Sequence, residues 1–301
     1  MKRALSVAGV ALSADALISL RRVALMADAA PVLSALPGGF TTRRKGHGLE
    51  VADIREYVPG DDIRHLDRGT TARTGRLHIR QFQQERDRIT LLVADFRPAM
   101  FWGIRRAFRS VAAAEALAMI GWNVVETGGR VALLAITPTD PIVVPPRGRT
   151  RGMLDVIGGM VQAHHAGLAA VQTGMIRDHP LDGGLTRADR FAPAGSELVL
   201  ASGFDVPGQD LADRLDALAR RRTPRLVLIT DADSRHLPRG RYPIRLPDGR
   251  RARIRLGAAS EQSARPIVQI AGRPALVLDA GDPVTDTARR IAAAFPPDRA
   301  A

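Results

Sequence analysis

ITLLVAD, residues 89–95, is a continuous apolar run that ends in a carboxylate. Unbroken apolar runs of this length are typical of strands that are buried on both faces of a parallel sheet. Three later runs have the same character: RVALLAI at 130–136, ELVLASGF at 197–204 and RLVLITDAD at 225–233. We therefore predict a sheet with these four strands at its core.

Helical patterns alternate with these strands. Residues 104–127 are alanine-rich and end at Gly128 and Gly129, which are typical helix-stop residues. Residues 153–161 and 211–218 each place apolar side chains on one helical stripe. The alternation predicts an α/β fold with a doubly wound, mostly parallel, Rossmann-type sheet and right-handed crossovers.

Shorter elements complete this domain. We expect an edge strand over 141–146, a loop with one short helix over 167–193, and a β-hairpin over 242–256. A last strand at 275–279 and a helix at 284–295 follow.

The chain is predicted to have three parts. Residues 1–36 form an N-terminal amphipathic helix, and 37–88 form a small, charge-rich subdomain with a strand near 77–82. Residues 89–301 form the α/β domain, which includes a basic hairpin at about 240–257.

The N-terminus begins with basic residues and a short apolar run, which also fits a secretory signal peptide. Asp15 interrupts that run and favours the helix. No stretch has the 18 or so continuous apolar residues that a membrane span needs. The chain has no cysteine, which excludes disulfides, thiolate zinc sites and a catalytic thiol. We expect a soluble, cytoplasmic protein.

The net charge of +13 is carried by arginine, since Lys2 and Lys45 are the only lysines. Residues 220–255 hold twelve arginines and three aspartates. This region suits nucleic acid or an anionic surface, although Tyr242 is its only aromatic residue, and the alternative is a solvated basic face. The predicted basic patch consists of Arg220, Arg221, Arg222, Arg241, Arg250, Arg251 and Arg253.

GLEVADIREYVPGDDIRHLDRGTTAR, residues 48–73, mixes both charge signs densely around a Pro-Gly turn. Its charges fit either a charge-paired structural brace or a docking surface for a protein partner. The residues that define this motif are Arg55, Tyr57, Pro59, Gly60, Asp61, Asp62, Arg64, Asp67 and Arg73.

Enzymatic signatures are absent: there is no nucleophile elbow, phosphate loop or His-Glu-x-x-His pair. His164 and His165 are adjacent and point about 100° apart on a helix, so they could not easily bind one metal ion together. We expect them on the surface or in a loop. Asp61 and Asp62 are better explained by the turn than by acid and base catalysis. We therefore predict no enzymatic activity, with a metal-dependent hydrolase as the remaining alternative.

Acidic residues follow the predicted core strands. Ligands bind open α/β sheets outside the carboxyl ends of the strands. Asp95, Asp205, Asp231 and Asp233 are therefore expected to share one rim of the sheet.

The 48–73 motif, followed by Glu85, Arg86 and the strand that ends in Asp95, resembles the bacterial domain of unknown function 58 family. The resemblance extends from about residue 48 to the C-terminus and departs at Arg68, where the family usually has tryptophan. It implies a von Willebrand factor A-like domain. It also implies an adaptor role, because related proteins resemble partners of MoxR-type AAA+ ATPases, which assemble or activate other proteins.

The resemblance further implies a degenerate metal-ion-dependent adhesion site. Such sites take an Asp-x-Ser-x-Ser loop, a threonine and a second aspartate around magnesium. Here Asp95 is kept, but Arg97 and Ala99 replace the serines, and Gly203 follows Ser202 in place of the aspartate. Two hydroxyls and one carboxylate of the oxygen shell that magnesium requires are therefore missing.

Thr186 corresponds to the threonine of the second loop in this comparison. We expect no cofactor, with magnesium as the alternative. Our hypothesis is that the Arg97 guanidinium takes the place of the ion by pairing with Asp95 or Asp205. The alternative is that Arg97 points into solvent.

Overall fold

A computed structural model describes residues 7–29, 50–58, 61–83, 88–175, 177–231, 240–245, 250–256 and 266–295. The chain divides into two compact units. The smaller unit comprises residues 41–88, and the larger comprises residues 1–40 together with 89–301.

A mostly parallel sheet forms the centre of the larger unit. Within the described residues its strands are β3 (Ile89–Asp95), β4 (Arg130–Ile136), β5 (Ile142–Gly148), β6 (Glu197–Ser202), β7 (Thr223–Thr230), β10 (Ile267–Ile270) and β11 (Arg273–Asp279). They lie in the order β10-β11-β7-β6-β3-β4-β5. The inner strands are parallel, and β10 and β5 pair antiparallel at the two edges. The predicted α/β class with a mostly parallel sheet is therefore confirmed.

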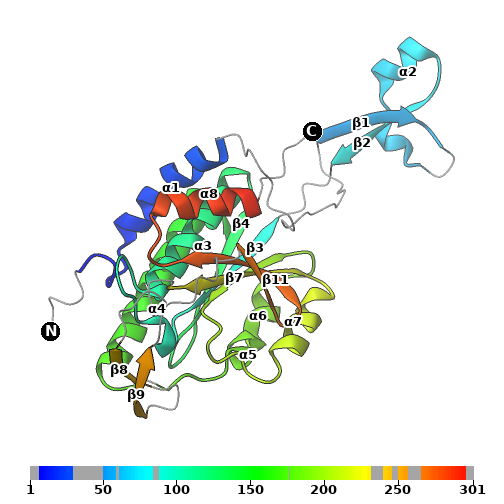
Figure 1. The fold of residues 1–301 in the computed structure, drawn as a ribbon. Helices are drawn as coiled ribbons and strands as arrows, with labels where there is room; N and C mark the ends of the chain where they lie inside the picture. Colours follow the sequence, from blue (N-terminus) through cyan, green and yellow to red (C-terminus); the bar gives the residue numbers. More distant parts are fainter. Residues whose placement is uncertain are drawn as a thin grey trace. The chain divides into compact units, whose positions relative to one another are not determined.

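Helices cover both faces of this sheet (Figure 1). One face carries α1 (Ala14–Ala29), α3 (Arg109–Glu126), α4 (Arg149–Gln172) and α8 (Val284–Ala294), and the other carries α5 (Leu181–Gly184), α6 (Ala188–Phe191) and α7 (Leu211–Ala219). Strand β3 serves both layers, because Leu92 and Ala94 pack into the first core and Leu91 and Val93 into the second. Burial on both faces explains why its sequence is continuously apolar.

The N-terminal helix α1 packs on α3 and belongs to the larger unit. The indole N–H of buried Trp122 donates to the carbonyl of Leu17 at 3.1 Å, and the Arg21 guanidinium lies 5.5 Å from the Trp122 ring centre. Arg21 also pairs with Glu126 at 2.8 Å. These contacts attach α1 to α3 through a hydrogen bond, a cation–π contact and an ion pair. Over the described ranges, no helix has the length and apolar character to cross a membrane.

The smaller unit is an antiparallel pair, β1 (Glu50–Glu56) and β2 (His78–Gln83), joined by η2 (Ile63–His65) and α2 (Arg68–Thr74). The Asp62 carboxylate accepts the Arg64 N–H at 3.0 Å, and the Asp67 carboxylate accepts the Thr70 N–H at 2.6 Å. Both aspartates therefore cap short helices. Gly75 ends α2 in the left-handed region at φ 74°, where glycine is favoured.

Several element bounds differ from the prediction. Helix α3 begins at Arg109 rather than at residue 104, because the preceding loop folds back on itself: the Ile104 N–H donates to Asp231, and a Cβ at Gly103 would lie 2.1 Å from the Ala107 carbonyl. The expected hairpin is present as β8 (Gly240–Arg245) and β9 (Arg251–Leu256). Its predicted turn, residues 247–249, lies outside the described residues.

Candidate functional site

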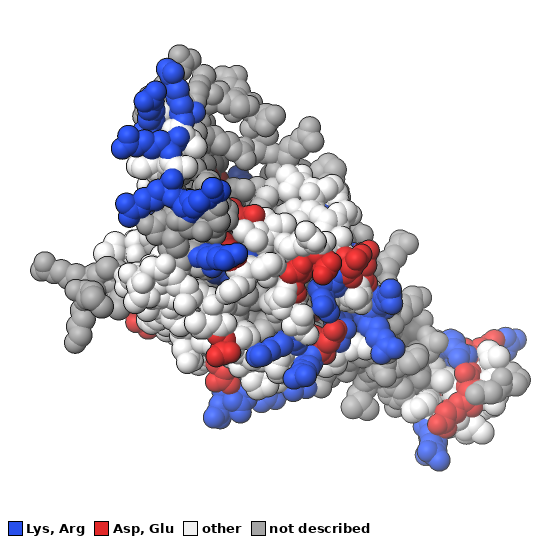
Figure 2. Space-filling view, turned by 90° about the horizontal axis from the view of Figure 1, so that it is seen from below, with Lys and Arg blue, Asp and Glu red and all other residues white. Residues whose placement is uncertain are grey.

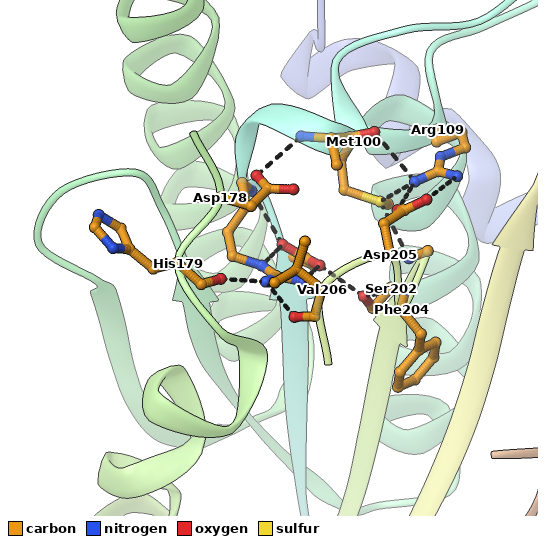
Figure 3. A network of polar contacts seen from close by, with 12 residues as sticks. Met100, Arg109, Asp178, His179, Ser202, Phe204, Asp205 and Val206 are labelled. Atoms are coloured by element: carbon orange, nitrogen blue, oxygen red, sulfur yellow. Dashed lines mark hydrogen bonds and ion pairs between the residues drawn. The ribbon is translucent and has the colours of Figure 1, made fainter. Parts of the chain in front are cut away.

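Figure 3 shows a network of polar contacts that includes Met100, Asp178 and Ser202. A buried arginine and carboxylate of this network lie at the carboxyl end of β3. The side chains of Arg97 and Asp95 are 2% and 1% exposed. Arg97 Nε donates to Asp95 Oδ1 at 2.9 Å, and Nη2 donates to Oδ2 at 2.8 Å, so the two groups meet as parallel forks. The Arg97 backbone N–H also donates to Oδ1 at 3.0 Å, and the Ser202 hydroxyl donates to Oδ2 at 2.6 Å. Each oxygen of Asp95 therefore accepts two hydrogen bonds.

The same guanidinium connects three loops. Its Nη1 donates to the carbonyls of His179, before α5, and Val206, after β6, the latter at 2.9 Å. Burial alone would lower the pKa of Arg97, but the charge and hydrogen bonds of Asp95, with the charges of Asp178 and Asp205 nearby, raise it above the ordinary arginine value. Arg97 is thus a permanent cation at the meeting point of these loops.

A second ion pair lies beside the first. Arg109 Nη2 and Nη1 donate to the two carboxylate oxygens of Asp205, and Nη2 also donates to the Ala99 carbonyl at 3.1 Å. The Arg109 guanidinium lies 5.1 Å from the ring centre of Trp102. A Cβ at Gly203 would lie 2.0 Å from Arg109 Nη2, so a larger residue there would displace the Arg109 guanidinium.

Two further carboxylates hold the loop that follows β3. Asp178 is 8% exposed and accepts the Ala99 N–H at 3.1 Å. Its burial raises its pKa, against the opposing effects of the Ala99 hydrogen bond and the Arg97 charge. Asp231, 5% exposed, accepts the Ile104 N–H at 2.7 Å. These described rim carboxylates therefore accept hydrogen bonds from backbone or arginine donors.

The structure separates the predicted site residues. Arg97 pairs with Asp95 and not with solvent, whereas Asp205 pairs with Arg109. Thr186 is exposed in η4 (Leu185–Arg187), where its hydroxyl donates to the Gly183 carbonyl at 2.9 Å. Asp233 lies outside the described residues.

Sequence reasoning missed Arg109 and Asp178. An arginine in the first turn of an otherwise apolar helix was the available signal for Arg109. Asp178 follows no strand or motif, and only the folded chain places it beside Ala99.

His164 corrects a further expectation, because it is fully buried in α4 and not on the surface or in a loop. Its Nε2 lies 3.2 Å from the Ser110 hydroxyl, and the rings of Phe96 and Phe101 pack against the imidazole. Burial, with the charge of His165, lowers the pKa of His164 to about 3. A neutral, enclosed imidazole of this kind is a core group.

Metal binding needs several convergent ligands. Across the ranges that the structure describes, no three His, Asp or Glu side chains are placed to hold an ion. Among the described rim residues, Asp95 and Asp205 instead pair with Arg97 and Arg109.

The motif of the smaller unit contains an ion pair between Arg55 and Asp61. Arg55 Nη1 and Nη2 donate to the Asp61 carboxylate, at 2.8 and 2.6 Å, and Asp61 also accepts the Val58 N–H at 2.8 Å. The hydrogen bond from Arg55, followed by that from Val58, lowers the pKa of Asp61. Pro59 and Gly60, predicted as the turn, lie outside the described residues.

Two arginines of the basic region 220–255 are paired with acidic residues. Arg222 pairs with Asp189 at 2.8 Å, and buried Arg225 pairs with Glu197, so these two charges are neutralised within the larger unit. Arg220 and Arg221 are exposed after α7. In Figure 2, one projecting group of basic side chains carries almost no acidic residue, whereas both signs mix elsewhere on the visible face.

Comparisons with known proteins give one family and a few relatives. The family described as "Protein of unknown function DUF58" matches residues 53–269. Uncharacterized proteins of Mycobacterium bovis and of two strains of Mycobacterium tuberculosis are each 35% identical over 121 residues, which is 39% of this chain. The chain spans 38% of the length of each of these relatives.

Proposed function

This chain belongs to the DUF58 family of proteins of unknown function, and on that premise we propose that it is a non-catalytic adaptor. In this proposal it works with a MoxR-type AAA+ ATPase in assembling or activating a client protein or complex. At the described part of the sheet rim, Asp95 and Asp205 are each paired with an arginine, and this supports a non-catalytic role. The smaller unit supports the docking role.

The observation that carries the proposal is the surface of the smaller unit. Val58, Ile63 and Leu77 are 56%, 69% and 50% exposed in a unit with little core of its own. Exposed arginines, Arg64 and Arg73, lie in the same segment. Apolar side chains beside arginines are the composition of protein interfaces, where these residues anchor a partner.

We expect Arg73→Ala and Ile63→Ser each to reduce capture of the cognate ATPase at least fivefold in a pull-down with the purified proteins. Neither side chain makes a hydrogen bond or ion pair with another described residue, so the fold should be unaffected. Asp62→Ala should also weaken capture, but it additionally removes the cap of η2 and requires a stability check. The matched control is exposed Arg190→Ala in the larger unit.

The control should capture the ATPase as well as the unaltered protein does. Undiminished capture by folded Arg73→Ala and Ile63→Ser would remove the smaller unit as the docking surface. Equal losses with Arg73→Ala and the control Arg190→Ala would indicate a general charge effect instead.

We propose further that the α/β unit is von Willebrand factor A-like and that Arg97 replaces the ion of a degenerate adhesion site. In support, the guanidinium engages both oxygens of Asp95, and Ala99 supplies no hydroxyl. Gly203 supplies no carboxylate, and a Cβ there would displace the Arg109 guanidinium from its present position. These residues do not fit magnesium, whose octahedral shell needs free oxygen ligands.

Isothermal titration calorimetry should accordingly detect no magnesium binding below millimolar concentration, because an ion would have to displace a buried cation from Asp95. Manganese serves as a second probe in the same experiment. A saturable heat with micromolar affinity, lost in Asp95→Asn, would contradict the degenerate site.

A further inference from the structure

The register of the β8–β9 hairpin places arginines opposite one another. Arg241 pairs with Arg255, and Arg245 pairs with Arg251. Arg253 lies between these pairs and faces Pro243. Residues that pair across an antiparallel ladder share a face, and side chains alternate between faces along each strand. One face of the hairpin is therefore an array of arginine positions.

Exposure follows the same alternation. Arg241, Arg251, Arg253 and Arg255 are exposed, while the intervening Tyr242, Ala252 and Ile254 are partly buried. The hairpin thus has one cationic, solvent-facing side and one side of largely apolar residues.

Within the described residues, no acidic side chain balances this array. No hydrogen bond or ion pair joins Arg241, Arg251, Arg253 or Arg255 to another described residue, and neither described strand contains an acidic residue. Elsewhere in the larger unit arginines pair with carboxylates, as Arg106 does with Glu115, Arg147 with Asp155 and Arg273 with Asp216. Like charges directly opposite each other destabilise a β-ladder, so a bound polyanion would stabilise the hairpin.

We propose that this arginine face binds double-stranded DNA through its phosphates, without recognising sequence. The activity is separate from the proposed adaptor role and uses a different part of the chain. A two-stranded β-ribbon fits the major groove, and arginines two positions apart on a strand are spaced about 6.6 Å apart. The guanidinium fork matches phosphate oxygens in bidentate geometry.

The composition of the face favours duplex DNA over other anions. A membrane surface would gain most from apolar groups beside the cations, but Tyr242 and Ile254 alternate to the other face. An acidic protein would need apolar anchors, and apart from its arginines the exposed face offers only Pro243. A single strand would need stacking aromatics, which this face lacks in its described residues. Phosphate contacts alone suffice for a duplex.

The test is fluorescence anisotropy of the full chain with a labelled 20-base-pair DNA duplex between 50 and 200 mM KCl. Four phosphate contacts predict a slope of log affinity against log salt of about −3.6. The variant Arg251→Gln/Arg253→Gln/Arg255→Gln should bind at least tenfold more weakly at 100 mM KCl. Its slope should be less steep by about 2.7, since three contacts are lost.

The matched control, Arg151→Gln/Arg187→Gln/Arg190→Gln, removes the same charge from exposed positions of the larger unit. It should bind within about twofold of the unaltered protein with nearly the same slope. Equal losses in the two triple variants would overturn the proposal in favour of general attraction by net charge. Circular dichroism checks the fold of each variant. If the hairpin triple variant does not fold, the single variant Arg253→Gln replaces it. Its slope should be less steep by about 0.9.

Three further probes test the choice of ligand. The probes are a single strand of the same length, phosphatidylserine vesicles and polyglutamate. If the chain binds any one of them more tightly than the duplex, the proposal is overturned. A preference for the duplex that disappears with the hairpin variant supports it. The ATPase pull-down is unaffected by these outcomes, so the two proposals fail independently.

Discussion

Arg97→Met should lower the free energy of unfolding by about 3–5 kcal/mol, the usual effect of removing one partner of a buried ion pair. The substitution leaves the Asp95 carboxylate buried with only the Ser202 hydroxyl and one backbone N–H as donors. It also removes the donor to the carbonyls of His179 and Val206, so three loops lose their common contact. Urea unfolding followed by circular dichroism measures the loss.

A double-mutant cycle measures the interaction energy between Asp95 and Arg97 separately from the effects of each side chain alone. Asp95→Asn/Arg97→Met should be less destabilised than the sum of the single variants by at least about 1 kcal/mol, because neither charge is then buried alone. Arg147→Met is the control, since its pair with Asp155 is half exposed and should contribute less than about 1 kcal/mol. A loss of that small size for Arg97→Met would show that the buried pair does not hold the loops together.

Acid should destabilise the protein through His164. The folded chain holds its pKa at about 3, against 6.5 for the ordinary side chain, so between these values the unfolded chain binds a proton that the folded chain does not. The stabilisation is therefore complete above pH 6.5 and is lost as the pH falls towards 3. From pH 7 to pH 5, this residue should lower the free energy of unfolding by about 2 kcal/mol.

His164→Gln removes the titration while keeping a polar group near Ser110. Its free energy of unfolding should change by about 2 kcal/mol less than that of the unaltered protein between pH 7 and pH 5. Asp178, whose raised pKa acts in the opposite direction, is common to both proteins and cancels in the comparison. Exposed His165→Gln serves as the control, and the same pH dependence in all three proteins would refute the assignment to His164.

The main sheet could be predicted because burial on both faces leaves a local mark. The observed bounds of β3 and β4 match the apolar runs at 89–95 and 130–136, since every inward position must be apolar. Strand β10 was not predicted, because its four partly exposed residues have no such run. It forms by pairing with β11 across a turn at Ala271 and Gly272, both with positive φ.

Helix α2 was missed for a related reason. Its sequence, RGTTART, has no apolar stripe, and none of its residues is buried. The Asp67 cap and the left-handed Gly75 define its ends. Short polar helices carry little periodic information because they bury little surface.

By itself, the sequence determined the layered α/β class and the hairpin, which follow from periodicity and turn residues. It left Arg97 to pair with Asp95, to pair with Asp205 or to point into solvent, and the folded chain decided for Asp95. Only the tertiary structure decided that Asp205 pairs with Arg109 and that His164 is buried, because these contacts join residues far apart in the chain. A buried charge must find its partners wherever the fold brings them, and no local pattern records which distant donor or acceptor that will be.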